Sequence, residues 1–281
     1  MDLMVKDKTQ LDSRYPLSED HISYFKENGF VKLPDVFSSE MLSVYGREIS
    51  LKVRELNTMH LPMVERDTYQ KAFLQVINLW RHSGIVEEFV FGKRLARIAA
   101  VLLEVDGVRM YHDQALYKEP GGGFTPWHAD QYYWPLASEK VCTAWIPLQQ
   151  THLDMGPLEF SAKSHHYADG RNLKISDESE VMIQNMLKRQ QFNTVQEPFE
   201  FGEISFHYGW TFHRAGPNTT SNPRNVMTII YMDHRMRLKE PKNDNQILDR
   251  DTFCPGVRTG ELIETELNPV LYHVNHDGAS E

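Results

Sequence analysis

The fold of this chain is set by the run Val108-Arg109-Met110-Tyr111-His112-Asp113-Gln114-Ala115-Leu116-Tyr117. Before this run apolar residues repeat at helical spacing, whereas from Val108 onward the period is two, as in a β-strand. Three further stretches have strand character: 141–148, 203–207 and 225–232. Turns rich in Pro, Gly and Asn separate them. Many short strands joined by such turns predict a mainly β protein whose antiparallel strands form a two-sheet jelly roll.

A helical segment is expected in front of these strands. Ser18 is placed as the N-cap of a helix that ends at Asn28-Gly29, and a short strand follows at 30–33. Ser38 begins a second helix that runs to about Leu56. Residues 83–105 carry apolar side chains at helical spacing, which is typical of a face packed on the core.

These patterns predict a single domain over residues 1–281 with flanking helices. Its expected parts are a mostly helical N-terminal part at 1–106, a jelly-roll core at 107–235 with a polar insertion at about 169–198, and a C-terminal extension at 236–281. Helical spacing occurs within the insertion. A long insertion near a site is either a lid or a surface helix without a role.

Bulk properties favour an enzyme that acts on small molecules. A net charge of −9 and a sequence pI near 5.8 argue against nucleic acid, because a nucleic-acid binder carries a basic stripe. No apolar run approaches the roughly 18 residues of a membrane span, and no apolar segment of a secretory signal follows the first charged residues. Cys142 and Cys254 are expected to be free thiols in a reducing, cytoplasmic setting. The sequence does not indicate the oligomeric state.

Two motifs carry candidate chemistry. The first is Trp127-His128-Ala129-Asp130, and the second is Phe212-His213-Arg214-Ala215-Gly216-Pro217-Asn218. At a strand end, side chains two residues apart point to one side, so the imidazole of His128 and the carboxylate of Asp130 would converge. His213 would complete a set of two histidines and one carboxylate, which leaves one face of a metal open, as in non-haem Fe(II) oxygenases. Eleven residues later, Arg224 offers a guanidinium fork for an acid cosubstrate.

The flanks of these motifs resemble the phytanoyl-CoA dioxygenase family of Fe(II)/2-oxoglutarate-dependent oxygenases. The likeness runs from about residue 16 to 232. It is carried by Phe25-Lys26-Glu27-Asn28-Gly29-Phe30, by Tyr117-Lys118-Glu119-Pro120-Gly121-Gly122-Gly123, by Ala144-Trp145-Ile146-Pro147-Leu148 and by Met155-Gly156-Pro157-Leu158-Glu159-Phe160.

The resemblance implies a double-stranded β-helix core of the cupin-like kind. It also implies that His128, Asp130 and His213 bind Fe(II), and that 2-oxoglutarate and O₂ are consumed with release of succinate and CO₂. Related halogenases have a small residue where this chain has Asp130, so halogenation is disfavoured.

The resemblance further indicates residues for the cosubstrate. Arg224 is expected to hold the distal carboxylate of 2-oxoglutarate, with Thr228 on the same side of its strand; the alternative for Arg224 is a surface salt bridge. Trp145 matches a tryptophan that lines the cosubstrate pocket of relatives, although a core position fits equally. Gln114 and Lys118 share one strand face and could reach the pocket. At Ala215 some relatives place a serine that this chain lacks.

For the substrate, one or two aromatic side chains directly after the metal motif are expected to face the cavity. The candidates are Tyr132 and Trp134, with Tyr133 between them; the rival interpretation is packing on the barrel rim. His207 is expected to be a strand residue with a satisfied ring and not a ligand. His165 and His112 are expected to be structural.

The sequence therefore predicts a non-haem Fe(II)/2-oxoglutarate-dependent dioxygenase that hydroxylates, or otherwise oxidatively tailors, a small-molecule metabolite. Two alternatives remain at this stage: a non-catalytic jelly-roll binding protein, and a metal-dependent cupin-type enzyme that does not use 2-oxoglutarate. A binding protein would not need all three ligands, and a cupin-type enzyme would not need Arg224.

Overall fold

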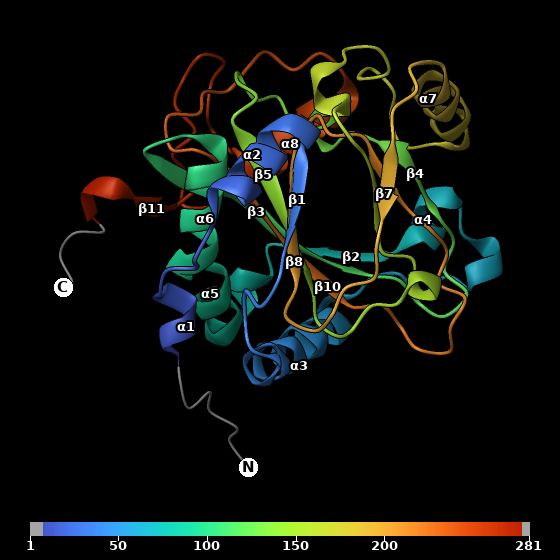
Figure 1. Cartoon of the computed structure of the whole chain (residues 1–281), viewed down its shortest axis with the longest axis horizontal. Helices are drawn as coiled ribbons and strands as arrows, with labels where there is room; N and C mark the ends of the chain where they lie inside the picture. The colour runs from blue at the N-terminus through green and yellow to red at the C-terminus, as the bar shows by residue number, and fades with distance from the viewer. Residues whose placement is uncertain (1–7, 277–281) are drawn as a thin grey trace.

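The computed structural model describes residues 8–276 and contains two antiparallel sheets that face each other (Figure 1). The large sheet has the order β1-β8-β5-β10-β3-β11, with β2 also paired to β3, and the small sheet has the order β4-β9-β6-β7. The large sheet consists of β1 (Phe30–Leu33), β2 (Leu74–Ile77), β3 (Gly107–Tyr117), β5 (Val141–Pro147), β8 (Ile204–Tyr208), β10 (Val226–Asp233) and β11 (Val270–His273). The small sheet consists of β4 (Thr125–His128), β6 (Leu158–Ser161), β7 (Thr194–Gln196) and β9 (His213–Ala215). The predicted double-stranded β-helix is confirmed.

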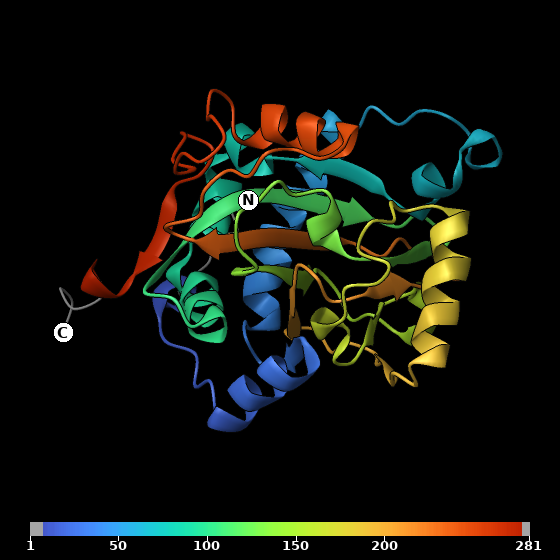
Figure 2. The ribbon, with the colours of Figure 1, turned by 90° about the horizontal axis from the view of Figure 1, so that it is seen from above.

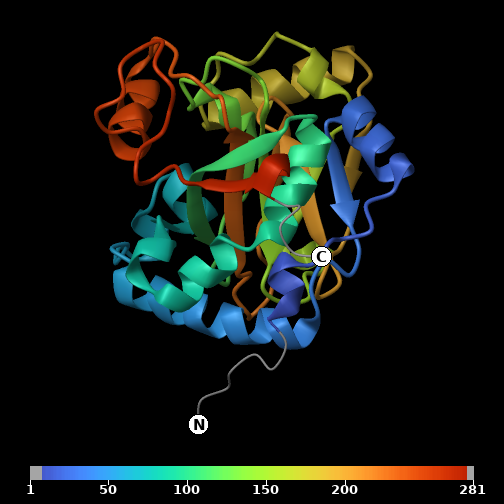
Figure 3. The same cartoon turned by 90° about the vertical axis from the view of Figure 1, so that its left-hand side faces the viewer.

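Helices cover the outer face of the large sheet (Figures 2 and 3). They are α1 (Thr9–Asp12), α2 (Glu19–Asn28), α3 (Ser39–Leu56), α5 (Gly84–Val90) and α6 (Lys93–Leu103). The largest core cluster joins their apolar faces to β1, β3, β5, β8 and β10, so the helices close one side of the sheet and leave the other side for the cavity. Ser18 and Ser38 cap α2 and α3 as predicted, and Gly29 ends α2 with a φ of 87°, a conformation that favours glycine.

A bulge in β3 at Tyr111 changes which side chains face the cavity. Ile230 of β10 pairs with His112, but the next residue, Tyr231, pairs with Met110, so Tyr111 is the extra residue. Met110 packs on the helical side, whereas His112 and the alternate residues after it line the cavity. The bulge thus turns His112, Gln114 and Leu116 toward the cavity.

Other elements lie around the two sheets. They are α4 (Thr68–Ala72), α7 (Asp177–Arg189), α8 (Asp244–Phe253) and the 3₁₀ turns Met63–Glu65, Leu79–His82, Asp130–Tyr132, Leu153–Met155, Ser164–His166 and Val274–His276. Helix α7 forms in the predicted polar insertion and packs on β4. Helix α8 and β11 belong to the C-terminal extension. Within residues 8–276, no helix combines the length and apolar character that a membrane crossing requires.

Candidate active site

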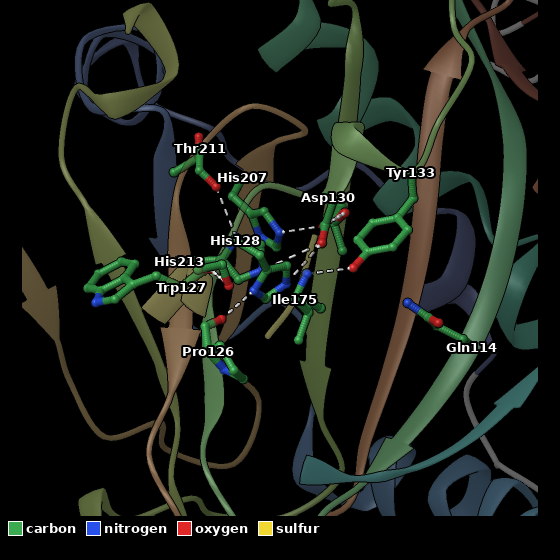
Figure 4. Close-up of polar contacts among 12 residues, drawn as sticks. Gln114, Pro126, Trp127, His128, Asp130, Tyr133, Ile175, His207, Thr211 and His213 are labelled. Carbon is green, nitrogen blue, oxygen red and sulfur yellow. Dashed lines mark hydrogen bonds and ion pairs between the residues drawn. The ribbon is translucent and has the colours of Figure 1, made fainter. Parts of the chain in front are cut away.

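His128, Asp130 and His213 meet at one point between the two sheets (Figure 4). His128 ends β4, and its Cα pairs directly with that of His213 at the start of β9. The Nε2 atoms of His128 and His213 lie 3.5 Å and 3.6 Å from Oδ1 of Asp130. All three candidate ligand atoms lie within 4.8 Å of one another, and among the described residues this is the group of His, Cys, Asp and Glu that could hold a metal ion. The predicted triad is therefore assembled by strand pairing.

The orientation of both imidazoles is fixed by the backbone. Nδ1 of His128 lies 2.7 Å from the carbonyl oxygen of Pro126, and Nδ1 of His213 lies 3.0 Å from that of Thr211. Since a carbonyl oxygen only accepts hydrogen bonds, each Nδ1 carries the proton and each Nε2 keeps its lone pair for a metal. Burial, followed by the neighbouring His128, lowers the pKa of His213 well below its usual value, which keeps the ring neutral.

Asp130 is held by two residues of the large sheet. Its Oδ2 accepts hydrogen bonds from the Thr143 hydroxyl at 3.0 Å and from Nε2 of His207 at 3.1 Å, so Oδ1 is left for the metal. Burial opposes the carboxylate charge, but the imidazoles of His213, His128 and His207 hold the pKa of Asp130 well below its usual range. His207 is thus not a member of the triad but positions it. Its Nδ1 has no hydrogen-bond partner among the described residues, so its ring is only half satisfied.

We expect His207→Phe to weaken metal binding by about 10- to 100-fold, because loss of an outer hydrogen bond frees the ligating carboxylate to rotate. Phe keeps the ring volume and removes the donor. Titration with Mn(II) measures the affinity, and His60→Ala, at an exposed histidine, is the control. An affinity equal to that of the unmodified protein would remove the positioning role of His207.

The insertion supports β4, the strand that ends in His128, on the side away from the triad. In α7, Glu180 accepts a 2.7 Å hydrogen bond from the backbone N–H of Trp127, and its other oxygen pairs with Arg214 at 2.8 Å. Trp127 points away from the triad and packs against Ile183 and Leu187 of α7 (Figure 4). Helix α7 therefore braces β4 and β9, the two strands that carry the histidines.

Arg224 is a buried cation in the same cavity. It is 2% exposed, and no carboxylate pairs with it among the described residues. Its Nη1 donates to the carbonyl oxygen of Gly156, its Nε has no partner, and its guanidinium carbon lies 5.4 Å from the ring centroid of Trp145. Burial lowers the pKa of Arg224 to about 9, so the group stays charged at neutral pH. The surface salt bridge is excluded, and a buried cation without an acidic partner among the described residues fits a bound carboxylate.

Trp145 and Thr228 lie in the same cavity as Arg224. Both are buried, and both line the cavity; the Thr228 hydroxyl donates to the backbone oxygen of Gln114 at 3.2 Å. Lys118 lies behind this region and donates to Gly123 and Thr125 instead of lining the cavity. Burial, with a further contribution from Arg224, lowers the pKa of Lys118 to about 6. Arg224 is therefore the stronger candidate for the cosubstrate charge.

Gln114 lines the cavity on β3, between His112 and the Lys118 position that pairs with Arg224. A chain of hydrogen bonds reaches it from the N-terminal part: the Tyr69 hydroxyl donates to Gln75 at 2.9 Å, and Nε2 of Gln75 donates to Oε1 of Gln114 at 2.6 Å. This chain fixes the amide so that its nitrogen is free to donate. Figure 4 shows the Gln114 side chain extending from β3 toward the side of Tyr133 and the triad.

The aromatic residues after the triad divide between two roles. Trp134 and Tyr133 line the cavity, and the Tyr133 hydroxyl accepts a hydrogen bond from the backbone N–H of Ile175 in the insertion. Tyr132 does not line it. The backbone oxygen of Tyr132 accepts a hydrogen bond from Gln246, and its hydroxyl lies 3.4 Å from Asn245; both partners are in α8. Tyr132 therefore anchors the C-terminal extension to the 3₁₀ turn Asp130–Tyr132.

Several lining residues come from segments that contain no recognisable site motif. The cavity has a volume of about 550 Å³, within the range of small-molecule sites. The unforeseen residues are Tyr69, Phe73, Gln75 and Ile77 from the N-terminal part, Lys174 and Ile175 from the insertion, and Asn245, Leu248, Asp249, Thr252 and Phe253 from α8. His112, expected to be structural, packs on Phe253 and also lines the cavity. Nε2 of His165 donates a hydrogen bond to the backbone oxygen of Lys26, and His165 lies outside the site.

Comparison with known proteins gives one family. The model described as phytanoyl-CoA dioxygenase (PhyH) matches residues 25–226. A probable alpha-ketoglutarate-dependent hypophosphite dioxygenase from Stutzerimonas stutzeri is 21% identical over 225 residues, which cover 74% of this chain and 76% of that protein.

Two solved structures from nogalamycin biosynthesis share the fold. The epimerase SnoN, in complex with Fe³⁺, alpha ketoglutarate and nogalamycin RO, matches with a TM-score of 0.75 and 22% identity, over 95% of this chain and all of that one (100%). The non-heme alpha ketoglutarate dependent carbocyclase SnoK matches with a TM-score of 0.74 and 23% identity, over 91% of this chain and 96% of that one.

Proposed function

This chain belongs to the phytanoyl-CoA dioxygenase family of Fe/2-oxoglutarate-dependent oxygenases, and we propose that it hydroxylates, or otherwise oxidatively tailors, a small-molecule metabolite with release of succinate and CO₂. One observation carries the proposal: the triad and the unpaired Arg224 line one cavity. Family membership sets aside the non-catalytic binding protein and the cupin-type enzyme without 2-oxoglutarate. One structurally similar protein is named as a carbocyclase and another as an epimerase. Ring formation and epimerisation are therefore alternatives to hydroxylation for this chain.

The donor set fits Fe(II) and 2-oxoglutarate. Two neutral imidazoles and one carboxylate suit a divalent iron that keeps open positions, and Arg224 supplies a charge that matches the distal carboxylate of the cosubstrate. When bound with O₂, iron and cosubstrate supply the oxidising power for attack on a C–H bond. Asp130 favours hydroxylation over halogenation, since it fills the position that a halide would need.

The residues of the chain then have separate roles. His128, His213 and Asp130 fix the metal, while His207 and Thr143 fix the rotation of Asp130. Trp145 and Thr228 form the wall beside Arg224. Residues of helix α8 and of the insertion also line the cavity, where their side chains would restrict water around a bound substrate.

The first test is anaerobic addition of Fe(II) and 2-oxoglutarate to the purified protein. We expect the weak visible charge-transfer band of the iron–cosubstrate chelate, because the triad leaves adjacent positions for a bidentate 2-oxo acid. Succinate release then serves as the readout in a screen of candidate substrates. A folded protein that binds Fe(II) but shows no band with 2-oxoglutarate would contradict the proposed function.

A further inference from the structure

The cavity has a second polar end, formed by His112 and by Asp249 of α8. Along β3, His112 lies opposite Ile230, whereas Lys118 lies opposite Arg224. The six steps along the strand from His112 to Lys118 span about 20 Å. The Asp249 end is therefore remote from the Arg224 end, and a cosubstrate held at Arg224 leaves it free.

Asp249 offers a carboxylate oxygen without a partner. The Tyr111 hydroxyl, turned toward α8 by the bulge in β3, donates to Oδ2 of Asp249. Oδ1 receives no hydrogen bond from residues 8–276, and no Lys, Arg or His in that range forms an ion pair with Asp249. Asn245 and Thr252, one helical turn to either side, line the cavity with it.

Aromatic rings line the same cavity as this carboxylate and pack on one another. Phe253 stacks on His112 with ring centroids 4.0 Å apart and an interplanar angle of 14°. Trp134 lies edge-on to His112 at 6.4 Å, and Tyr111 lies 5.7 Å from Phe253. Burial lowers the pKa of His112 to about 4, so its ring is uncharged at neutral pH. Its Nδ1 is buried without a partner. Asp249 is thus the acidic group of this part of the cavity, which we call the aromatic box and define by His112, Trp134, Asp249 and Phe253.

We propose that this box binds a positively charged nitrogen, so that the substrate of the proposed oxygenase is a small organic cation with a protonated or quaternary amine. The inference rests on the proposed function, because it places the substrate in the cavity of the triad. A carboxylate and aromatic faces are the two groups that recognise an ammonium. A substrate that presents a hydroxyl group would need only a neutral acceptor here. A carboxylate in a cavity without a counter-charge is costly, and a bound cation would supply that charge.

The titration behaviour of Asp249 agrees with this assignment. Burial raises its pKa to about 8, and the hydrogen bond from Tyr111 acts in the opposite direction. Near neutral pH the empty site therefore takes up a proton, and a cation bound beside Oδ1 replaces that proton. Tyr111 remains a neutral donor, since burial raises its own pKa well above the usual value.

The test compares two probes of similar shape, 2-phenylethylammonium and 2-phenylethanol, by isothermal titration calorimetry on the full chain. We expect the cation to bind at least tenfold more tightly than the alcohol. Asp249→Asn should remove that preference: the affinity for the cation should fall at least tenfold, and the affinity for the alcohol should not change. Asp251→Asn, the same substitution on the exposed side of α8, is the matched control and should change neither.

Equal affinities for the two probes, no saturable binding of the cation, or an Asp249→Asn variant that binds the cation normally would each overturn the inference. The comparison on the unmodified protein decides the matter if Asp249→Asn fails to fold. The iron–cosubstrate band separates the two proposals: a band without cation preference contradicts only the amine site. Cation binding that depends on Asp249, without the band, contradicts only the oxygenase function.

Discussion

His128→Ala and Asp130→Ala are expected to abolish 2-oxoglutarate turnover. Each variant removes one of the three ligand atoms that lie within 4.8 Å of one another. A bound metal contributes several kcal/mol to the reaction, which corresponds to a loss of about 10³-fold or more in rate. Succinate release measures the loss, and metal titration shows whether it arises from weaker iron binding.

The fold should survive both substitutions. The two side chains lie at the interior of the cavity, and β4 keeps its support from α7 through Trp127 and Glu180. His60→Ala, at an exposed histidine far from the metal motif in sequence, is the control and should retain full activity. Full turnover in either triad variant, with unchanged metal content, would show that the metal site lies elsewhere.

The sequence predicted the core strands because their signals are local. Residues 108–117, 141–148 and 225–232 match β3, β5 and β10 to within one residue at each end. The convergence of His128 and Asp130 follows from the period of a strand. His213 is predicted because the residues around it resemble the family's motif. The register that places His213 opposite His128 is long-range, and the sequence alone does not contain it.

The far end of the cavity could not be predicted from one sequence. The bulge at Tyr111 shifts the phase of β3, and no glycine or proline marks it. The face of α8 that carries Asp249 becomes a cavity wall only because the C-terminal extension folds back over the sheet. Tyr132 and Trp134 are two residues apart, but the 3₁₀ turn Asp130–Tyr132 breaks the strand period and sends them to different places.

The insertion also shows why sequence left two options open. Its polar composition is typical of both a lid and a surface helix. The structure gives it elements of each, since Lys174 and Ile175 line the cavity while α7 packs behind β4. The bracing role depends on Glu180, which reaches Trp127 and Arg214 from 53 and 34 residues away along the chain.

Arg224→Ala is expected to raise the 2-oxoglutarate concentration needed for half-maximal turnover by at least about 30-fold. Loss of one partner from a buried, hydrogen-bonded charge pair costs about 2 kcal/mol or more, and 1.4 kcal/mol is tenfold in affinity. Arg224→Lys should give a smaller but clear increase, because an ammonium keeps the charge and loses the two-pronged fork. The maximal rate at saturating cosubstrate should fall less than the apparent affinity.

A purely structural role of Arg224 would give a different pattern. Without an acidic partner among the described residues, the buried guanidinium has little electrostatic stabilisation, so Arg224→Ala should lower the thermal midpoint only modestly. Arg235→Ala, at an exposed arginine, should change neither the cosubstrate requirement nor the midpoint. If Arg224→Ala instead unfolded the protein at low temperature and left the cosubstrate requirement of its folded fraction unchanged, the carboxylate would have to bind elsewhere in the cavity. The absence of an acidic partner for Arg224 among the described residues is the reason to expect the opposite, since a buried cation gains a counter-charge when the cosubstrate binds.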